Sequence, residues 1–289
     1  MMRIAVAVSE PDWQARSLLD AFREMGAAAR AVRLADCAFD TTVRSGLRIA
    51  GFDDLPDAML VRTIGAGTFE EVTRRLGILH ALGGLGVLVW NRATAIERCV
   101  DKSMTSFLLA RAGVATPASF AVEGREAAEA VVRREVGPLV VKPLFGSQGR
   151  GLRLVRQPED LPEQEAMAGV YYVQRFVPTG EAGAFRDFRL LVCAGEVVAA
   201  MTRRGSDWIT NVRRGGVPEA LSPDGDLVAA ALGAVEAVGA DYAGVDLLRG
   251  PGGEPMVIEV NSMPGWRGLQ SVTDVSIARH VAQAMLRAL

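Results

Sequence analysis

Apolar and polar residues follow two alternating patterns over the first ninety positions. Short aliphatic runs, typical of buried strands, alternate with longer segments whose apolar residues recur at helical spacing. The expected strands are 3–8, 29–34, 58–62 and 87–90, and the expected helices are 11–25 and 69–82. Strands that alternate with helices favour a parallel sheet with crossover helices. We therefore predict an α/β lobe over residues 1–92.

The pattern changes along the rest of the chain. A helical stretch at 93–112 is followed by short strands, and the later strands are joined by short turns, which favours antiparallel pairing. The expected strands are 139–142, 152–155, 170–177, 185–192, 196–202, 243–249 and 254–260, and the expected helices are 224–238 and 276–289. We predict a small α+β lobe at 93–177 and a larger antiparallel α+β lobe at 178–289.

Composition and charge argue against several classes of protein. The 289 residues carry 32 basic and 34 acidic side chains, so bulk attraction to nucleic acid or to an anionic membrane is not expected. No apolar stretch reaches the length of a membrane span, and the first apolar run is too short for a signal peptide. Cys37, Cys99 and Cys193 form no CxxC pair, which argues against a disulfide framework or a zinc site. We expect a cytoplasmic enzyme.

Two carboxylates and an amide converge in the segment 243–265. The turn Gly250-Pro-Gly-Gly253 joins two apolar strands in a hairpin. Glu259 and Asn261 are two positions apart and share one face of their strand, and the hairpin brings Asp246 opposite them. Buried carboxylates need a partner, and oxygen ligands suit Mg²⁺. Ion pairs with arginines are the alternative for Asp246 and Glu259.

A glycine-rich segment at 142–151 follows an expected strand. Its glycines, among them Gly146 and Gly149, permit backbone N–H groups to close over phosphates, and Ser147 adds a hydroxyl. Lys142 places a cation at the end of the strand. The segment is neither a Walker motif nor a dinucleotide fingerprint, because no Gly-Lys-Ser/Thr follows and the next element is a strand. A plain hairpin turn is the alternative.

Further basic residues are candidates for binding anionic groups. Asp101-Lys102 opens a helix whose N-terminus favours anions. A guanidinium suits carboxylate and phosphate groups, and arginines are frequent beside the carboxylate cluster. The candidate arginines in this part of the chain are Arg189, Arg203, Arg213 and Arg214; Asp187 shares a strand face with Arg189, and Asn211 precedes Arg213 by two positions. Exposed salt bridges are the alternative for each arginine. Together with Arg62 of the first lobe, Arg213 and Arg214 are candidates for holding an acidic amino acid or an anionic acceptor.

In order and spacing, these features resemble the ATP-grasp superfamily and specifically its RimK-type amino-acid ligases. The resemblance covers about residues 93–270, with a weaker match in the first lobe. The matching features are Asp101-Lys102, Lys142-Pro with its glycine loop, Tyr172-Val-Gln-Arg-Phe-Val177, Arg186-Asp-Phe-Arg189, Arg203, Asn211 to Gly216, Gly244-Val-Asp246 and Glu259-Val-Asn261. The resemblance implies an ATP-grasp fold with a Rossmann-like first lobe, a central lid lobe and a C-terminal antiparallel lobe that holds the metal site.

The same resemblance implies roles for individual residues. Those expected to bind ATP are Lys102, Lys142, the lid residues Gly146, Ser147, Gln148 and Gly149, the adenine hinge Gln174, Arg175, Phe176 and Val177, and Asp187 and Asn211. Asp246, Glu259 and Asn261 would hold one or two Mg²⁺ ions, or Mn²⁺. Arg203 and Lys142 would act in catalysis, with Arg203 stabilising the acyl phosphate and the tetrahedral intermediate. Arg175 stands where the family usually has an acidic residue, which affects the side-chain contacts of the hinge and not its backbone contacts.

The resemblance implies an ATP-dependent carboxylate–amine ligase that forms an amide through an acyl phosphate. Glutamate or another amino acid would be added to a small-molecule coenzyme or a peptide. The segment 264–270 resembles that of ligases that extend C1 coenzymes of the pterin or deazaflavin type, so a coenzyme tail is the leading hypothesis for the acceptor. The alternatives are a phosphotransferase on the same scaffold and a non-catalytic nucleotide-binding protein. The complete set of lysines, carboxylates and asparagine argues against the latter. We further expect a homo-oligomer that binds neither nucleic acid nor a membrane.

Overall fold

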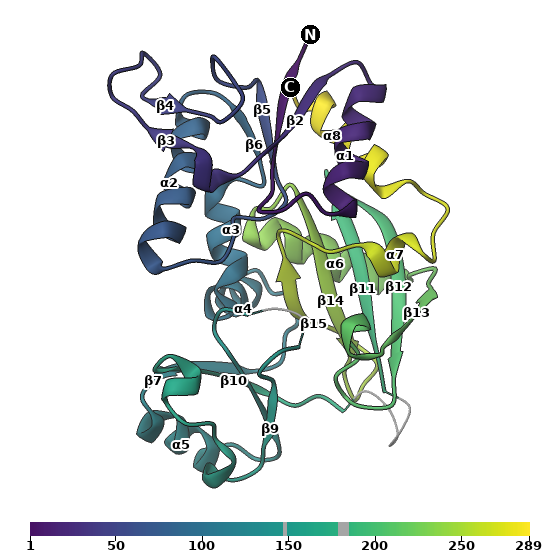
Figure 1. Ribbon diagram of the computed structural model, residues 1–289. Helices are drawn as coiled ribbons and strands as arrows, with labels where there is room; N and C mark the ends of the chain where they lie inside the picture. Colours follow the sequence, from purple (N-terminus) through teal and green to yellow (C-terminus); the bar gives the residue numbers. More distant parts are fainter. Residues whose placement is uncertain (147–148, 179–184) are drawn as a thin grey trace.

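The computed structural model describes residues 1–146, 149–178 and 185–289, and Figure 1 shows how they are arranged. Two residues of the predicted lid, Ser147 and Gln148, lie outside the described residues. None of the helices within these ranges is long and apolar enough to cross a membrane.

The first lobe is built on a parallel sheet, as the alternating pattern predicts. Its strands are β1 (Arg3–Ala7), β2 (Ala28–Val32), β5 (Ala58–Val61) and β6 (Leu88–Trp90), in the order β2-β1-β5-β6. Three helices cover it: α1 (Trp13–Glu24), α2 (Phe69–Gly84) and α8 (Ile277–Arg287). Alternate residues of β1 face opposite sides, since Ile4 and Val6 pack with α1 and α8 while Ala5 and Ala7 pack with α2. The chain therefore returns at its C-terminal helix to complete the first core.

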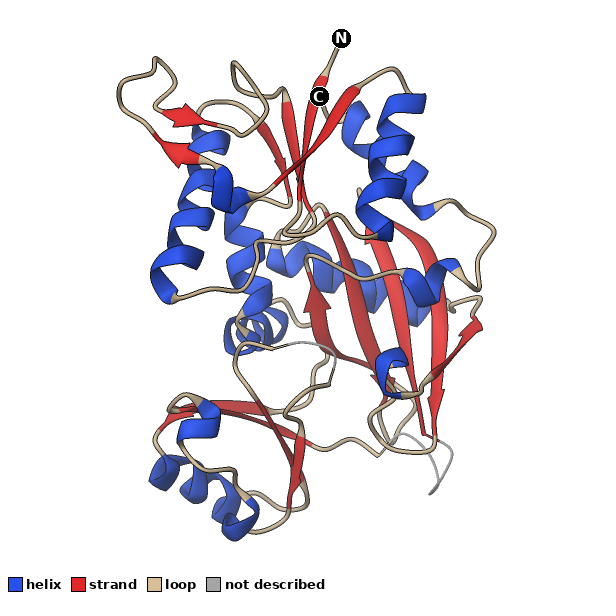
Figure 2. Cartoon of the chain, in the orientation of Figure 1, coloured by secondary structure: helices blue, strands red, loops and turns tan. Residues whose placement is uncertain are grey.

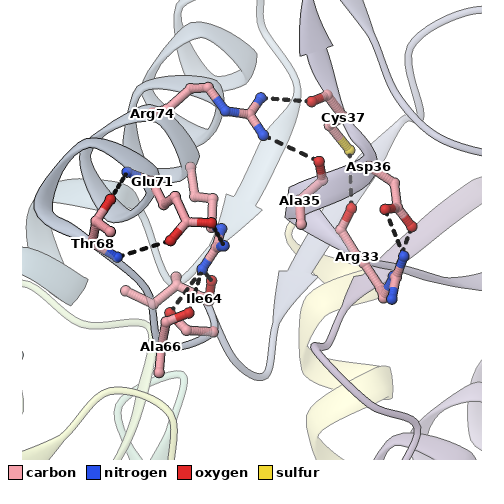
Figure 3. A network of polar contacts seen from close by, with 11 residues as sticks. Arg33, Ala35, Asp36, Cys37, Ile64, Ala66, Thr68, Glu71 and Arg74 are labelled. Atoms are coloured by element: carbon pink, nitrogen blue, oxygen red, sulfur yellow. Dashed lines mark hydrogen bonds and ion pairs between the residues drawn. The ribbon is translucent and has the colours of Figure 1, made fainter.

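The loop after β5 is held by the start of α2. Thr68 caps this helix in a capping box with Glu71 (Figure 3). Arg75 donates to the backbone carbonyls of Ile64 and Ala66. Arg74 donates to the carbonyls of the short helical turn η1 (Leu34–Asp36) and of Cys37, next to the small hairpin of β3 (Ala38–Phe39) and β4 (Leu47–Arg48). These contacts fix the loop that begins at Arg62.

The central lobe is an antiparallel sheet with one helix on it. Its strands are β7 (Ser119–Glu123), β8 (Leu139–Lys142), β9 (Arg153–Val155) and β10 (Val170–Arg175), in the order β7-β10-β8-β9. Helix α5 (Arg125–Arg134) buries Ala128, Val131 and Val132 against it. The sequence patterns did not predict β7 and α5. The helix has only this narrow apolar stripe among charged residues, and β7 is short and incompletely buried.

The C-terminal lobe is the antiparallel sheet that the short turns predict (Figure 2). Its strands are β11 (Phe185–Cys193), β12 (Glu196–Gly205), β13 (Val217–Ala220), β14 (Tyr242–Arg249) and β15 (Pro255–Asn261), in the order β13-β12-β11-β14-β15. The edge strand β13 was not predicted. Helix α6 (Gly225–Val238) covers one face of this sheet, and α7 (Arg267–Gln270) packs on β12 from the other side.

The prediction of one continuous helix over 93–112 is wrong. The structure has α3 (Ala93–Val100) and α4 (Lys102–Arg111), separated at Asp101. The Asp101 backbone is extended, and its carboxylate accepts hydrogen bonds from the backbone N–H groups of Ser103 at 2.8 Å and Met104 at 3.1 Å. An N-cap inside the apolar pattern thus ends one helix and starts the next, which confirms the predicted helix start at Lys102.

Asn91 connects the first lobe to the C-terminal lobe. It is fully buried, and its side-chain oxygen accepts from the backbone N–H groups of Asp241 at 2.6 Å and Tyr242 at 3.0 Å. Its amide donates to the carbonyls of Tyr242 at 2.7 Å and Ser262 at 2.5 Å. The Tyr242 hydroxyl in turn donates to the Val61 carbonyl at the end of β5. Because every polar atom of the Asn91 side chain is used across this junction, the two lobes are held in one fixed arrangement.

The three cysteines are buried and free. Burial raises the pKa of the Cys99 and Cys193 thiols to about 12, and it raises the pKa of Cys37 as well. At pH 8 we expect the thiolate fraction of Cys99 and Cys193 to fall about 10³-fold below that of an ordinary thiol. Ellman's reagent should therefore react with the native protein far more slowly than with protein in urea. Immediate reaction of all three thiols in native protein would contradict the burial.

Candidate active site

One pocket between the central and C-terminal lobes collects nine of the predicted site residues. It is formed by the start of α4, the end of β8, the glycine-rich segment and strands β11, β12, β14 and β15. The predicted residues that line it are Lys102, Lys142, Gly146, Gly149, Asp187, Arg203, Asn211, Asp246 and Glu259. Pro143, Arg150, Leu152 and Ile258 line it too and were not predicted.

The predicted convergence of carboxylates is confirmed by the register of β14 and β15. Asp246 lies opposite Glu259, and Gly244 lies opposite Asn261. A register shift next to Asp246 leaves Ile258 without a paired residue, which explains how two successive residues of β15 both line the pocket. The sequence contains no signal for this bulge. Two carboxylates thus lie opposite each other on adjacent strands at one side of the pocket, and Asn261 lies two positions beyond Glu259 on β15.

Four charged side chains form an alternating row across β11, β12 and β14. Arg189 binds Asp246 in bidentate geometry, with both N–O distances 2.6 Å. Arg203 lies 3.2 Å from the same carboxylate, and its Nε donates to Asp187 at 2.6 Å. Burial disfavours ionisation of Asp246, but the two guanidinium groups outweigh it and hold the pKa of this carboxyl below its usual value. Ion pairs with arginines were the alternative to metal binding expected from the sequence, and Asp246 makes such pairs in the structure.

Glu259 differs from Asp246 in its partners. Among the residues that the structure describes, no ion pair involves Glu259, although Lys102 and Lys142 line the same pocket. Burial lowers the pKa of both lysines, that of Lys142 to about 8, and the Glu259 carboxylate opposes the decrease. The Lys142 ammonium donates to Gln174 Oε1 at 2.7 Å, and Lys102 donates to the carbonyls of Leu144 and Gly146. Both cations therefore have neutral hydrogen-bond acceptors, which leaves their charge available to an anionic ligand.

The glycine-rich segment contacts the C-terminal lobe at Gly149. This residue has φ of +68°, and a Cβ here would lie 2.6 Å from Asn211 Oδ1 and 2.9 Å from a methyl carbon of Ile209. Both the backbone conformation and the close approach require glycine. Arg214 donates to the Gly149 carbonyl at 3.0 Å. Arg214 thus holds the glycine-rich segment against the turn η4 (Val212–Arg214). From the sequence Arg214 was predicted to bind substrate, and this contact was not predicted.

The predicted adenine hinge does not line this pocket. The Arg175 N–H already donates to the Ala118 carbonyl and the Phe176 N–H to the Pro138 carbonyl. Val177 is thus the hinge residue whose N–H makes no backbone hydrogen bond within the described part of the chain. The Arg175 side chain is exposed and pairs with Glu135 at 2.6 Å, so its departure from the family pattern is explained by a contact outside the pocket.

Four further predicted residues do not line the pocket. Arg62 is buried in the junction between the first lobe and the loop after β15, where it donates to the Pro264 carbonyl at 2.8 Å. Arg213 is exposed on η4. Arg189 and Asn261 also do not contribute to the pocket lining, although both adjoin it through Asp246 and Glu259.

Comparison with known proteins agrees with this geometry. The model of the RimK-like ATP-grasp domain matches residues 99–285. The chain therefore belongs to the RimK-like ATP-grasp family.

Relatives with assigned names are similar over 78% to 98% of the chain. Tetrahydromethanopterin:alpha-L-glutamate ligase of Methanosarcina acetivorans is 30% identical, with 98% of each chain covered. The ligase of the same name from Methanococcus maripaludis is 35% identical over 78% of this chain and 77% of its own. A probable alpha-L-glutamate ligase of Teredinibacter turnerae is 31% identical over 98% of this chain and 94% of its own.

Solved structures confirm the fold. The ATP-grasp ligase PsnB in complex with its minimal precursor superimposes with a TM-score of 0.76 at 20% identity, covering 99% of this chain and 98% of that one. A RimK domain ATP-grasp protein from Sphaerobacter thermophilus gives a TM-score of 0.73 at 24% identity, covering 98% of this chain and 99% of that one. The predicted ATP-grasp architecture of three lobes is thus present.

Proposed function

We propose that this protein is an ATP-dependent carboxylate–amine ligase that adds glutamate to an acceptor through an acyl phosphate. The observation that carries the proposal is the single pocket in which Lys102, Lys142 and Arg203 face Asp246 and Glu259. Cations suited to phosphate and oxygen ligands suited to a divalent ion are combined there. The alpha-L-glutamate ligases that align with nearly the whole chain support the same chemistry.

The residues of the pocket fit a nucleotide. Lys102 and Lys142 would bind its phosphates, since both line the pocket and their ammonium groups hydrogen-bond to neutral oxygen atoms. Gly146 and Gly149 would place the glycine-rich segment over the phosphates, and the Val177 N–H would meet adenine. Asp187 and Asn211 would add polar contacts, with Asp187 held in place by Arg203.

The donor set also fits Mg²⁺. Asp246, Glu259 and Asn261 supply oxygen atoms from two adjacent strands, and such ligands suit this ion. Asp246 keeps lone pairs beyond those that Arg189 and Arg203 occupy, and Glu259 has no competing ion pair among the described residues. When bound, one or two such ions neutralise the charge of the phosphates, and Mn²⁺ would satisfy the same ligands.

The reaction follows from these charges. A carboxylate oxygen of the acceptor attacks the γ-phosphorus in line, and the bond from that phosphorus to ADP breaks. Lys142 and Arg203 stabilise the charge that develops on the transferred group. The amine of the incoming amino acid then attacks the acyl carbon, the bond to phosphate breaks, and the amine proton passes to solvent. The glycine-rich segment excludes water while the acyl phosphate exists, because water would hydrolyse it.

The acceptor proposed here is a small molecule of the coenzyme type. Two relatives carry the name tetrahydromethanopterin:alpha-L-glutamate ligase, and the second is the more similar at 35% identity. The segment from Pro264 to Gln270, whose resemblance to coenzyme-extending ligases motivates this choice, follows directly on the metal-binding strand β15. A pterin-type coenzyme with a terminal carboxylate is therefore the first acceptor to test.

Oxygen labelling distinguishes the ligase from a phosphotransferase. The acceptor is labelled with ¹⁸O in its carboxylate and incubated with ATP, Mg²⁺ and glutamate. An acyl phosphate intermediate transfers one labelled oxygen to the released phosphate, because the amine displaces phosphate at the acyl carbon. A phosphorylated acceptor that accumulates without glutamate, with no free phosphate, would instead establish the phosphotransferase.

Glu259→Gln tests the metal ligands. The substitution keeps the size of the side chain and removes a charge that is proposed to hold the metal, so we expect kcat to fall about 10²–10³-fold. The unfolding midpoint should change little, because no ion pair among the described residues involves Glu259. The matched control is Glu254→Gln at the exposed end of the same hairpin, which should retain activity. Full activity of Glu259→Gln would remove this residue from the metal site.

A further inference from the structure

Arg62 is a buried cation without a carboxylate partner. It follows β5 directly and has only 4% of its surface exposed. Its guanidinium lies over the ring of Trp266 at 4.6 Å, donates to the Pro264 carbonyl at 2.8 Å and to Gln14 Oε1 at 3.2 Å, and faces the Tyr242 hydroxyl, all of them neutral groups. No ion pair among the residues that the structure describes includes it. A buried charge without a counter-ion is costly, so its retention suggests an anionic ligand.

The other buried arginines, Arg75 and Arg203, each have a carboxylate partner. Arg203 has two carboxylates within hydrogen-bond distance, Asp187 and Asp246. Arg75 pairs with Glu71 and donates to the carbonyls of the loop after β5. Arg62 is therefore the exception among them.

Unused donors surround Arg62. Its Nε, the amide nitrogen of Gln14 and the indole nitrogen of Trp266 are all buried, and none has a hydrogen-bond partner within the described residues. Gln14 has 8% of its surface exposed and Trp266 none. Buried donors are normally paired, and each one left unpaired is unfavourable. Three buried donors and one positive charge are thus grouped around Arg62 without a paired acceptor among the described residues.

The position in the fold is one where α/β sheets bind ligands. The strand order β2-β1-β5-β6 means that the chain leaves β1 toward one side for β2 and resumes on the other side at β5. The carboxyl ends of β1 and β5 thus form a switch point, which is where open parallel sheets bind ligands. Gln14 is the second residue of α1, whose N-terminal N–H groups add positive potential.

The same place adjoins the proposed site of amide formation. Trp266 and Pro264 belong to the loop that continues β15, the strand of Glu259 and Asn261. Gly265 is exposed between them, and a Cβ on it would lie 3.9 Å from Gln14 Oε1. Arg62 is thus joined to the loop that continues β15, and Gly265 is an exposed position of this loop next to Gln14.

We propose that Arg62, Gln14 and Trp266 form a carboxylate-binding subsite for the incoming amino acid. The subsite takes a carboxylate that does not react and thereby places the amine toward the acyl phosphate; this assignment rests on the proposed ligase function. One cation and two neutral donors match the single charge and the several lone pairs of a carboxylate. A phosphate group would bring up to a second negative charge, whereas the three side chains of this subsite carry a single positive charge.

The first test compares enzyme variants with substrate variants. Wild type, Arg62→Gln and Gln14→Leu are assayed with L-glutamate, with L-glutamine and with the α-amide of glutamate. Arg62→Gln should lower kcat/KM for glutamate about 10- to 100-fold. One of the two amides lacks the carboxylate that Arg62 binds, and with that amide the substitution should leave the rate unchanged. If the amide is L-glutamine, the subsite binds the γ-carboxylate; if it is the α-amide, the subsite binds the α-carboxylate. KM for ATP should stay constant. An equal loss with all three amines would overturn the subsite. Arg16→Gln, an exposed residue of the same helix, is the control.

The second test does not depend on ligase activity. Sodium acetate is titrated at constant ionic strength while the thermal unfolding midpoint is measured, with inorganic phosphate in a parallel series. Acetate should raise the midpoint of wild type and of Arg16→Gln, but not that of Arg62→Gln, because only a native carboxylate site is stabilised by ligand. Gln14→Leu should show a reduced response. The same rise in Arg62→Gln, or a response to phosphate alone, would overturn the proposal. An acetate response that depends on Arg62 in a protein without ligase activity would refute the ligase and retain the subsite.

Discussion

Replacement of Arg203 by methionine is expected to destabilise the fold by about 3–5 kcal/mol, because it leaves buried carboxylates without their partner. Asp187 and Asp246 have 5% and 2% of their surface exposed, and Arg203 binds both. Asp246 keeps Arg189, whereas Asp187 keeps no other ion pair among the described residues. The same change removes the guanidinium proposed to stabilise the acyl phosphate, so turnover should fall at least about 10³-fold. Urea unfolding and the rate of ADP release measure the two effects.

The neighbouring residue supplies a matched control for this experiment. Arg204 forms an exposed pair with Glu219 on the other face of β12, and Arg204→Met should cost at most about 0.5 kcal/mol. The double variant Asp187→Asn/Arg203→Met should be more stable than the sum of the two single effects predicts, because the asparagine at position 187 carries no charge that needs the missing arginine. If Arg203→Met is as stable as Arg204→Met, the alternating row of charges does not stabilise the sheet.

Replacement of Asn91 by alanine is expected to cost about 2–4 kcal/mol, since its removal leaves buried backbone groups unpaired. Asn91 is completely buried and makes four hydrogen bonds, to the N–H groups of Asp241 and Tyr242 and to the carbonyls of Tyr242 and Ser262. All of these partners belong to the C-terminal lobe. The change should therefore loosen the junction of the lobes as well as lower the unfolding midpoint, and limited proteolysis should cut the variant faster.

Thr42→Ala is the comparison for Asn91→Ala. Thr42 donates two hydrogen bonds to Asp40, one from its side chain and one from its backbone N–H, and both lie at an exposed turn. Water replaces such contacts, so this variant should unfold within about 0.5 kcal/mol of wild type. Asn91→Ala with equally small effects would mean that the lobes are joined mainly by their apolar surfaces.

The sequence predicted most of the architecture because its patterns are regular where elements are buried. The runs that became β1, β5 and β6 are almost entirely apolar, and all lie in the first core. The elements that were missed are those with little apolar surface. Strand β13 lies at the edge of its sheet and has no buried residue. The break at Asp101 is signalled only by one capping carboxylate, which an unbroken apolar periodicity conceals.

The site could be predicted where spacing in one hairpin decides which residues meet. Asp246 and Glu259 are opposite each other because of the turn between them, and strand alternation adds Asn261. Contacts between distant segments could not be predicted in this way. The pairing of Asp246 with Arg189 depends on the neighbouring strand β11, and the burial of Arg62 depends on a loop about 200 residues later in the chain. Ile258 enters the pocket through a bulge that no residue type announces.

The most direct test of the central claim is the mass of the product. Purified protein is incubated with ATP, Mg²⁺, glutamate and a panel of small acceptors that carry a carboxylate, and the products are analysed by mass spectrometry while ADP and phosphate are measured. The ligase predicts an acceptor heavier by one glutamyl residue, with one ADP and one phosphate released per product and no reaction without glutamate. ADP release that is independent of any amine, with a phosphorylated acceptor as the product, would contradict it.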